Sequence, residues 1–245
     1  MTGRGGTARI AGARTSYRWT LVVFFVVVTA TWWRPIHPAE QALHHSLTLI
    51  GLVALLLVQR ARPLPYASFL LILIFLALHS VAARWIYSFV PYDDWTSALF
   101  GVRISETFGW QRNNFDRLVH LSYGLCFGPV IFRALAGRTR WAALLAVEIV
   151  VSTSALYELF EWAIAMTLAP ADAEAYNGQQ GDMWDAHRDM AIATLGAIAG
   201  VAVAYFVRRR STGGLSSGGE LSSSGELSSS GGQRTRRRLF VADRR

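Results

Sequence analysis

Long apolar blocks separated by short polar segments make up most of this chain. A helix needs about 20 apolar residues to cross a bilayer, and each block approaches or exceeds that length. The pattern predicts six membrane-spanning helices, near residues 17–33, 42–58, 66–87, 116–135, 141–168 and 191–207. We therefore expect an all-α fold, a polytopic membrane helix bundle. The longest polar and aromatic connection between spans, residues 91–112, could form a short interfacial helix.

The two ends of the chain have a different composition from the apolar blocks. Residues 1–16 are rich in Gly and Arg, and residues 208–245 combine a Ser/Gly-rich linker with an Arg-rich end. Such segments lack the apolar residues needed for a core. We predict a disordered basic N-terminus, a transmembrane domain over 17–207, and a disordered cytoplasmic tail. A cleaved signal peptide is the rival interpretation of the first block, but its length favours a span.

Composition and charge support this picture and orient it. With 52% apolar residues, the chain is too hydrophobic for an ordinary soluble domain, and its single cysteine, Cys126, excludes an internal disulfide or a Cys-based metal site. All 24 basic residues are Arg. With both termini inside, 18 of them lie on the cytoplasmic side, as the positive-inside rule requires. We expect a multi-pass protein of the bacterial cytoplasmic (inner) membrane, N-in and C-in.

The predicted partners follow from where the charge lies. Membrane lipids surround the spans, and the basic cytoplasmic tail is expected to contact anionic headgroups. The net charge of +8 could suggest nucleic acid, but its position beside the spans makes nucleic-acid binding unexpected. The sequence does not give an oligomeric state.

This orientation brings most of the intramembrane polar residues to the outer half of the bundle. Asp116 and His120 share one face of a helix, four residues apart. Glu158 and Glu161 lie roughly 10–15 Å inside the outer edge, at ~1.5 Å per residue, and His79 has a similar depth. Three aspartates enter with the last span: Asp182, Asp185 and Asp189. Ionisable groups at bilayer depth are costly and suggest function.

Several carboxylates persist together in a membrane only if they are protonated, paired with Arg or bridged by a cation. Arg112, Arg117 and Arg188 lie next to the acidic motifs in the sequence and could pair with these carboxylates. Carboxylate with imidazole suits Zn, Mn or Fe, whereas carboxylates alone suit Mg or Ca. A divalent metal ion is thus the cofactor to consider. We assign His120 and Asp116 as catalytic candidates and His79 as a secondary candidate for the same site. The metal-ligand candidates are Glu158, Glu161, Asp182, Asp185 and Asp189.

Two spans also carry small residues at helical spacing. Gly124 and Gly128 in the fourth span, and Gly196 and Gly200 in the sixth, form small-x-x-x-small pairs. Such pairs let two helix backbones approach closely in a membrane. They predict close packing of these helices rather than chemistry.

Three ordered motifs resemble a known family. They are Arg112-Asn113-Asn114-Phe115-Asp116-Arg117-Leu118-Val119-His120, Tyr157-Glu158-Leu159-Phe160-Glu161-Trp162, and Gln180-Gly181-Asp182-Met183-Trp184-Asp185 through Asp189-Met190. Over about residues 20–207 the chain resembles the YjdF-like bacterial inner-membrane proteins. The resemblance implies a polytopic inner-membrane protein of uncharacterised function that shares these motifs. Family members commonly have His-Tyr at Asn114-Phe115, and often Gln at His187, so Asn114 and His187 are discounted as ligands.

Three functions remain open at this point. A metal-dependent enzyme could act on a lipid or lipid-linked substrate from the outer leaflet, with His120 as ligand or general base. A transporter could exchange protons or a cation through Glu158 and Asp189, although no broken span or inverted repeat is visible. A structural or assembly protein could use the polar cluster to hold its helices together. The sequence shows no nucleotide loop, Gly-x-Ser-x-Gly elbow or His-Glu-x-x-His pattern.

Overall fold

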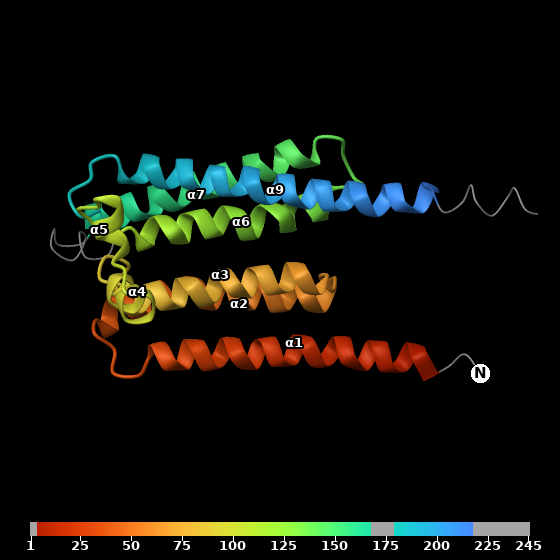
Figure 1. The fold of residues 1–245 in the computed structure, drawn as a ribbon, viewed down its shortest axis with the longest axis horizontal. Coiled ribbons are helices and arrows are strands. Elements are labelled where there is room, and N and C mark those ends of the chain that lie inside the picture. Colours follow the sequence, from red (N-terminus) through yellow and green to blue (C-terminus); the bar gives the residue numbers. More distant parts are fainter. Residues whose placement is uncertain (1–3, 168–178, 218–245) are drawn as a thin grey trace, which may run out of the picture. The chain divides into compact units, whose positions relative to one another are not determined.

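The computed structural model of the chain describes residues 4–167 and 179–217, with side chains for 15–167 and 179–211. Its described part is all-helical, which confirms the predicted fold class. The helices are α1 (Arg4–Thr31), α2 (Pro38–Ala61), α3 (Tyr66–Arg84), α4 (Tyr92–Phe100), α5 (Ile104–Phe108), α6 (Phe115–Leu135), α7 (Ala142–Thr167) and α9 (Asp185–Ser217) (Figure 1).

Five of these helices are long and apolar enough to cross a membrane, namely α2, α3, α6, α7 and α9. The apolar part of α1, Thr15–Thr31, is shorter than a usual span. The count of six spans and the N-in, C-in orientation therefore stay predictions. Apolar side chains such as Ile50 and Leu57 on α2 are more than 60% exposed, which suits a surface that faces lipid.

The predicted tails overlap partly with described helices. Helix α1 begins at Arg4, within the segment for which we predicted disorder, and α9 continues to Ser217, past the predicted boundary at 208. Residues 1–3 and 218–245 lie outside the described residues, so the prediction for the basic tail is not tested. Among the described residues, those up to Tyr205 belong to one compact unit, and those from Phe206 to Ser217 belong to a second.

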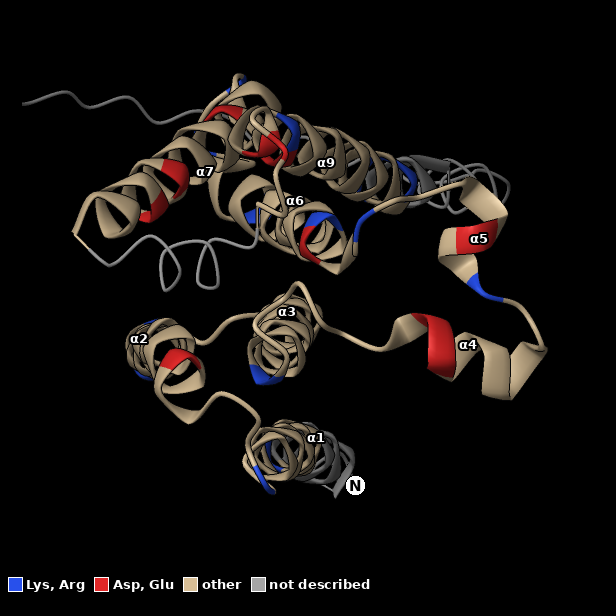
Figure 2. Ribbon diagram, turned by 90° about the vertical axis from the view of Figure 1, so that its left-hand side faces the viewer, with Lys and Arg blue, Asp and Glu red and all other residues tan. Residues whose placement is uncertain are grey.

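Within the first unit, the long helices form two groups of three. Helix α3 contacts α1 and α2, and it also contacts α6, which in turn contacts α7 (Figure 2). The first group is packed around Phe24, Leu52 and Phe69 from α1, α2 and α3. The second is packed around residues of α6, α7 and α9, including Phe132, Ala146 and Val201. The pair α3 and α6 joins the two groups.

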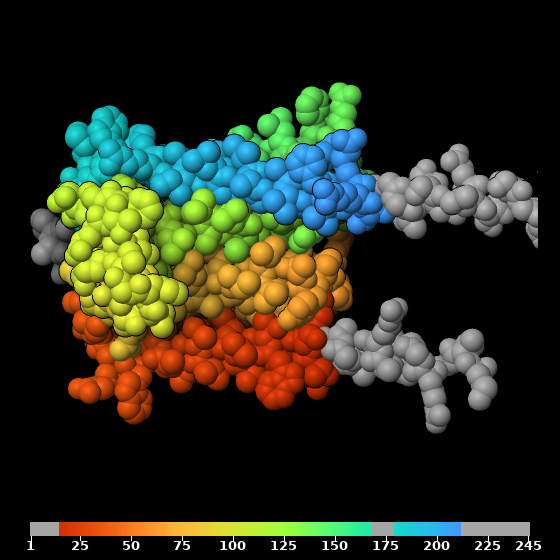
Figure 3. All heavy atoms as spheres, in the orientation of Figure 1, coloured from red at the N-terminus to blue at the C-terminus, as the bar shows by residue number. Residues whose placement is uncertain are grey.

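The connections separate into two ends of the first unit. The α2–α3 and α6–α7 connections lie at one end, together with the start of α1 (Figure 1). The α1–α2 connection, α4, α5 and the start of α9 lie at the other, which we call the acidic end (Figure 3). Helices α4 and α5 lie in the connection where a short interfacial helix was predicted. Helices α6 and α9 both start at the acidic end, so their first turns carry polar residues to a common level.

Candidate functional site

Three buried side chains from α6 and α9 meet near the acidic end. Asp116 and His120 are one turn apart on α6, and Asp189 lies on the second turn of α9. They are 7%, 8% and 2% exposed, and one ligand atom from each lies within 4.8 Å of the other two. Two ligands on opposite sides of one metal ion are about 4.2 Å apart, because ligand bonds are about 2.1 Å long. This triad can therefore close around a single ion with little movement.

The triad forms because the backbones of α6 and α9 lie in direct contact. A side chain on Gly124 would collide with the carbonyl of Ala193, and one on Gly196 would collide with the carbonyl of Leu121. One turn further on the contact is still tight but less so, with the nearest atoms 2.9 Å from a Cβ placed on Gly200 and 3.1 Å from one placed on Gly128. The close packing predicted from the small residues is thus confirmed. This contact brings Asp189 of α9 close to Asp116 and His120 of α6. The short Asp side chains could not bridge a wider gap between the helices.

Glu158 on α7 is the fourth group at this point. Its Oε1 lies 3.8 Å from His120 Nε2, and the same nitrogen lies 3.6 Å from Asp116 Oδ1. Among the described residues, Glu158 Oε1 and Asp189 Oδ1 are buried and have no hydrogen-bond partner. Buried oxygens are normally satisfied, and orphaned ones point to a missing ion, water or ligand. Glu161 lies one turn further along α7, where it interacts with Tyr157 and Glu158.

Asp182 and Asp185 belong to a separate arginine cluster, defined here with Arg112, Arg117 and Arg188. Asp182 accepts hydrogen bonds from Arg117, at 2.7 Å, and from Arg188, and Asp185 accepts one from Arg112. Arg112 and Arg117 also approach the other aspartate, at 3.5 and 3.8 Å. Both aspartates were predicted metal ligands, but arginines hold them instead. The predicted arginine partners are confirmed as the partners of these two carboxylates.

The arginine cluster lowers the pKa of Asp182. Burial works against the charged form, but the Trp184 backbone N–H, Arg188 and Arg117 outweigh it and hold the pKa below its ordinary value of 3.8. For Arg112, burial likewise opposes the charge, while the hydrogen bond to Asp185 keeps the pKa of the guanidinium above its ordinary value. Both groups are therefore charged at neutral pH.

A polar clamp holds the segment before α6 against the segment before α9. Gln180 accepts a hydrogen bond from the Asn113 backbone N–H at 2.9 Å and donates one to its carbonyl at 3.0 Å. The Asn113 side chain also donates to the carbonyl of Val90 and accepts from the Phe115 N–H. Sequence reasoning gave Asn113 and Gln180 no role. Their adjacency to the acidic motifs is the signal that could have found them.

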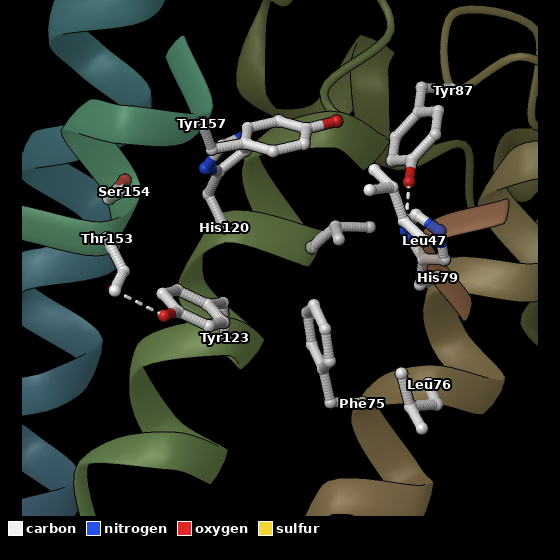
Figure 4. Close-up of a pocket in the computed structure, with 11 residues that line it drawn as sticks. Leu47, Phe75, Leu76, His79, Tyr87, His120, Tyr123, Thr153, Ser154 and Tyr157 are labelled. Carbon is white, nitrogen blue, oxygen red and sulfur yellow. Dashed lines mark hydrogen bonds between the residues drawn. The ribbon is translucent and has the colours of Figure 1, made fainter. Parts of the chain in front are cut away.

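A cavity of about 220 Å³ lies beside the triad, and His120 forms part of its wall (Figure 4). The remaining walls come from α2, α3, α6, α7 and the turn after α3, and they are mostly aromatic or aliphatic. Hydroxyl groups of Tyr123 and Thr153 contact each other at 2.6 Å across the α6–α7 contact. Pockets of this kind, apolar with a few fixed polar groups, are typical ligand sites. Sequence reasoning did not predict the cavity.

His79 lies on the opposite wall of this cavity and has its own partners. Its Nε2 donates to the carbonyl of His44 at 3.1 Å, so Nδ1 is left to accept a hydrogen bond from the Tyr87 hydroxyl. Ile86 and Tyr87 have positive φ angles of 41° and 59°, which are strained for such side chains. This turn folds Tyr87 back onto His79. The structure thus places His79 outside the triad, as an anchored wall residue.

Other residues lie where the sequence placed them. Asp189 is the most deeply buried aspartate of the acidic run, and His187 is exposed and packs edge-to-face against Trp184. Asn114 accepts from Arg117 at 2.9 Å and lies outside the triad. Discounting Asn114 and His187 as ligands therefore agrees with their positions. The geometry brings together Asp116, His120, Glu158 and Asp189, and the assignment of roles to them remains a proposal.

The fold and the polar cluster define a class, the polytopic α-helical membrane proteins with ionisable groups buried between spans. The chain belongs to the family described as "Predicted membrane protein (DUF2238)", whose family model matches residues 16–210. It is 32% identical to the inner membrane protein YjdF of Escherichia coli (strain K12) over 163 residues, which cover 64% of this chain and 74% of that protein. No solved structure matches significantly.

These comparisons confirm the family resemblance and the multi-pass, inner-membrane localisation that the sequence predicted. They assign no enzymatic or transport activity. The function is therefore inferred from the geometry of the site.

Proposed function

We propose that the protein is a metal-dependent membrane enzyme that acts on a lipid or lipid-linked substrate at the outer side of the bundle. Asp116, His120 and Asp189 hold one divalent cation, and Glu158 completes its ligand set or accepts a proton from a bound water. An imidazole among carboxylates favours Zn, Mn or Fe over Mg or Ca.

The observation that carries this proposal is the buried triad with its orphaned oxygens. Asp189 Oδ1 and Glu158 Oε1 lack hydrogen-bond partners among the described residues, although both oxygen atoms are buried. Leaving such an oxygen unsatisfied costs about 1–3 kcal/mol, and more for a charged group. A cation would offset the charge of the carboxylates and satisfy these oxygens at once.

The surroundings of the triad favour a lipid substrate. His120 belongs both to the triad and to the wall of the cavity, so a ligand in the cavity touches the proposed ion site. The walls are mainly apolar, and they lie between helices that can span the membrane. The arginine cluster lies at the same ends of α6 and α9, and its three guanidinium groups outnumber its two carboxylates, so its net positive charge can attract an anionic headgroup. Together these features support an amphiphilic substrate.

Metal analysis of the purified full-length protein in detergent tests the proposal. We expect about one equivalent of transition metal per chain, and titration with Mn²⁺ after chelation should restore it. Asp189→Asn keeps the side-chain size but removes a charged ligand, so Mn²⁺ affinity should fall at least about tenfold. Glu148→Gln is the matched control, because Glu148 is an exposed carboxylate ten residues before Glu158 on α7.

Two results would overturn the proposal. One is the absence of stoichiometric metal at neutral pH in folded, monodisperse protein. The other is an Asp189→Asn variant that binds Mn²⁺ as the unaltered protein does. If the substitution changes only thermal stability, the cluster is a structural network that holds α6, α7 and α9 together.

A further inference from the structure

The cavity beside the triad contains one hydroxyl group that the protein itself does not use. Ser154 on α7 lines the cavity and is 2% exposed. Its Oγ has no hydrogen-bond partner among the described residues. A buried hydroxyl without a partner is costly, and in a membrane span no bulk water can satisfy it.

The preceding residue, Thr153, explains why the Ser154 hydroxyl has no partner within its own helix. A serine in a helix usually donates to the carbonyl four residues earlier, which for Ser154 is that of Val150. Thr153 donates instead to the carbonyls of Ile149, at 2.6 Å, and Val150, at 3.1 Å. The Thr153 hydroxyl also meets Tyr123. The usual acceptor of Ser154 is thus already engaged, and its hydroxyl is left for the cavity.

Two other hydroxyl groups of the wall already have partners. Tyr87 pairs with His79, and Tyr123 pairs with Thr153 (Figure 4). Among the described residues, the wall contains no Arg or Lys that could neutralise a charged headgroup inside the cavity. The rest of the lining is aliphatic or aromatic, with Leu47, Phe75 and Leu76 from α2 and α3. A ligand that fits must be largely hydrocarbon and must carry an uncharged oxygen.

We propose that the cavity binds the hydrocarbon chain of an amphiphile and that Ser154 hydrogen-bonds an uncharged oxygen, a hydroxyl or an ester carbonyl, next to that chain. This inference rests on the proposed function in making that amphiphile the substrate, because His120 of the triad lines the cavity. Ser154 thereby sets the position of the chain relative to the ion, and the charged part of the molecule lies outside the cavity.

Photolabelling of the full-length protein in lipid nanodiscs tests the assignment. Three probes carry the same mid-chain diazirine, namely a long-chain alcohol, the matching fatty acid methyl ester and the matching alkane. We expect the alcohol, the ester or both to label residues of the cavity wall, and comparison of the two identifies the oxygen that Ser154 prefers. In Ser154→Ala, the affinity of the preferred probe should fall about fivefold, the value of one ordinary hydrogen bond.

Two further variants control the experiment. Ser152→Ala removes a hydroxyl from an exposed position of the same helix and should label as the unaltered protein does. Leu47→Phe adds volume at the cavity wall and should reduce labelling by all three probes. Equal labelling of the wall by the alkane and the oxygen-bearing probes, or unchanged labelling in Ser154→Ala, would overturn the inference.

The Mn²⁺ titration separates this inference from the proposed function. Ser154→Ala should bind Mn²⁺ normally, because Ser154 is not a ligand. Serine-dependent labelling in a protein that binds no metal would support the cavity assignment and reject the metal enzyme. Normal Mn²⁺ binding together with labelling that is unchanged in Ser154→Ala would reject the cavity assignment alone.

Discussion

Two kinds of carboxylate lie close together at the acidic end, and their partners distinguish them. Asp182 and Asp185 contact guanidinium groups, whereas Asp116 and Asp189 face His120. A carboxylate paired with arginine is neutralised and oriented, so it contributes to structure. A carboxylate with an orphaned oxygen is ready to bind a ligand. The sequence places all four in similar motifs, and only the contacts separate them.

Removing Arg112 should destabilise the fold, because Asp185 would be left buried without its nearest cation. The Arg112 and Asp185 side chains are only 12% and 5% exposed. We expect Arg112→Gln to cost about 3 kcal/mol of unfolding free energy. Arg103→Gln, which breaks exposed ion pairs to Asp94 and Glu106, should cost far less, because solvent screens exposed pairs. Denaturant unfolding in mixed micelles measures both. Equal costs for the two variants would contradict this account.

Asp182 should make the arginine cluster sensitive to acid. Because its folded pKa is below the ordinary value of 3.8, it stabilises the fold above that pH, and the contribution is lost as pH falls through the folded pKa. The protection of residues 179–188 against hydrogen exchange, corrected for the intrinsic pH dependence of exchange, should therefore fall below about pH 3.8. In Asp182→Asn, exchange should already be faster at neutral pH, with a weaker acid dependence. A variant that kept the full acid dependence would assign it to another group.

At the scale of the helices, the α6–α9 contact decides whether a site exists. The small residues predicted this contact, because in a membrane their spacing has a direct packing meaning. The rotation of α7 could not be predicted in the same way. That helix is apolar nearly all round, so its sequence does not show which face meets α6. The inward direction of Ser154 and the reach of Glu158 therefore had to come from the structure.

Gly196→Leu should separate α6 from α9 and dismantle the triad. The new side chain would meet the Leu121 carbonyl, which belongs to a helix backbone and cannot move aside. We expect a loss of about 3 kcal/mol or more in stability together with loss of Mn²⁺ binding. Gly51→Ala is the control, since its Cβ would meet only the flexible end of Leu76. Unfolding and Mn²⁺ titration of both variants measure the difference. Unchanged Mn²⁺ affinity in Gly196→Leu would contradict the role of this contact.

At the scale of the whole molecule, hydropathy and arginine positions predicted the class of fold and the end at which polar residues gather. Those signals are strong because the bilayer imposes them on every span. Contacts between distant residues, such as His79 with Tyr87 or Asn113 with Gln180, depend on turns and on helix rotation. Neither the turns nor the rotation of a helix leaves a periodic signal in the sequence. The ranking of candidate ligands could accordingly not be predicted, although nearly all the candidates lie at one end.

The predicted orientation can be tested with single cysteines. In a Cys126→Ala background, Phe100→Cys at the end of α4 should react with a membrane-impermeant maleimide added to intact bacterial cells, because this side chain is 76% exposed and the acidic end is predicted to be outside. Thr139→Cys, in the α6–α7 connection at the other end, should react only after the cells are opened. The reverse labelling pattern would invert the topology.

The division of the triad between α6 and α9 has a consequence for biosynthesis. A chain leaves the ribosome from its N-terminus, so α9 is the last of the described helices to enter the membrane. Until it docks, Asp116 and His120 have no Asp189 opposite them, and an ion would find only part of its ligands. Metal capture would then mark a chain whose insertion is complete, and a product truncated before α9 would be unable to retain the ion.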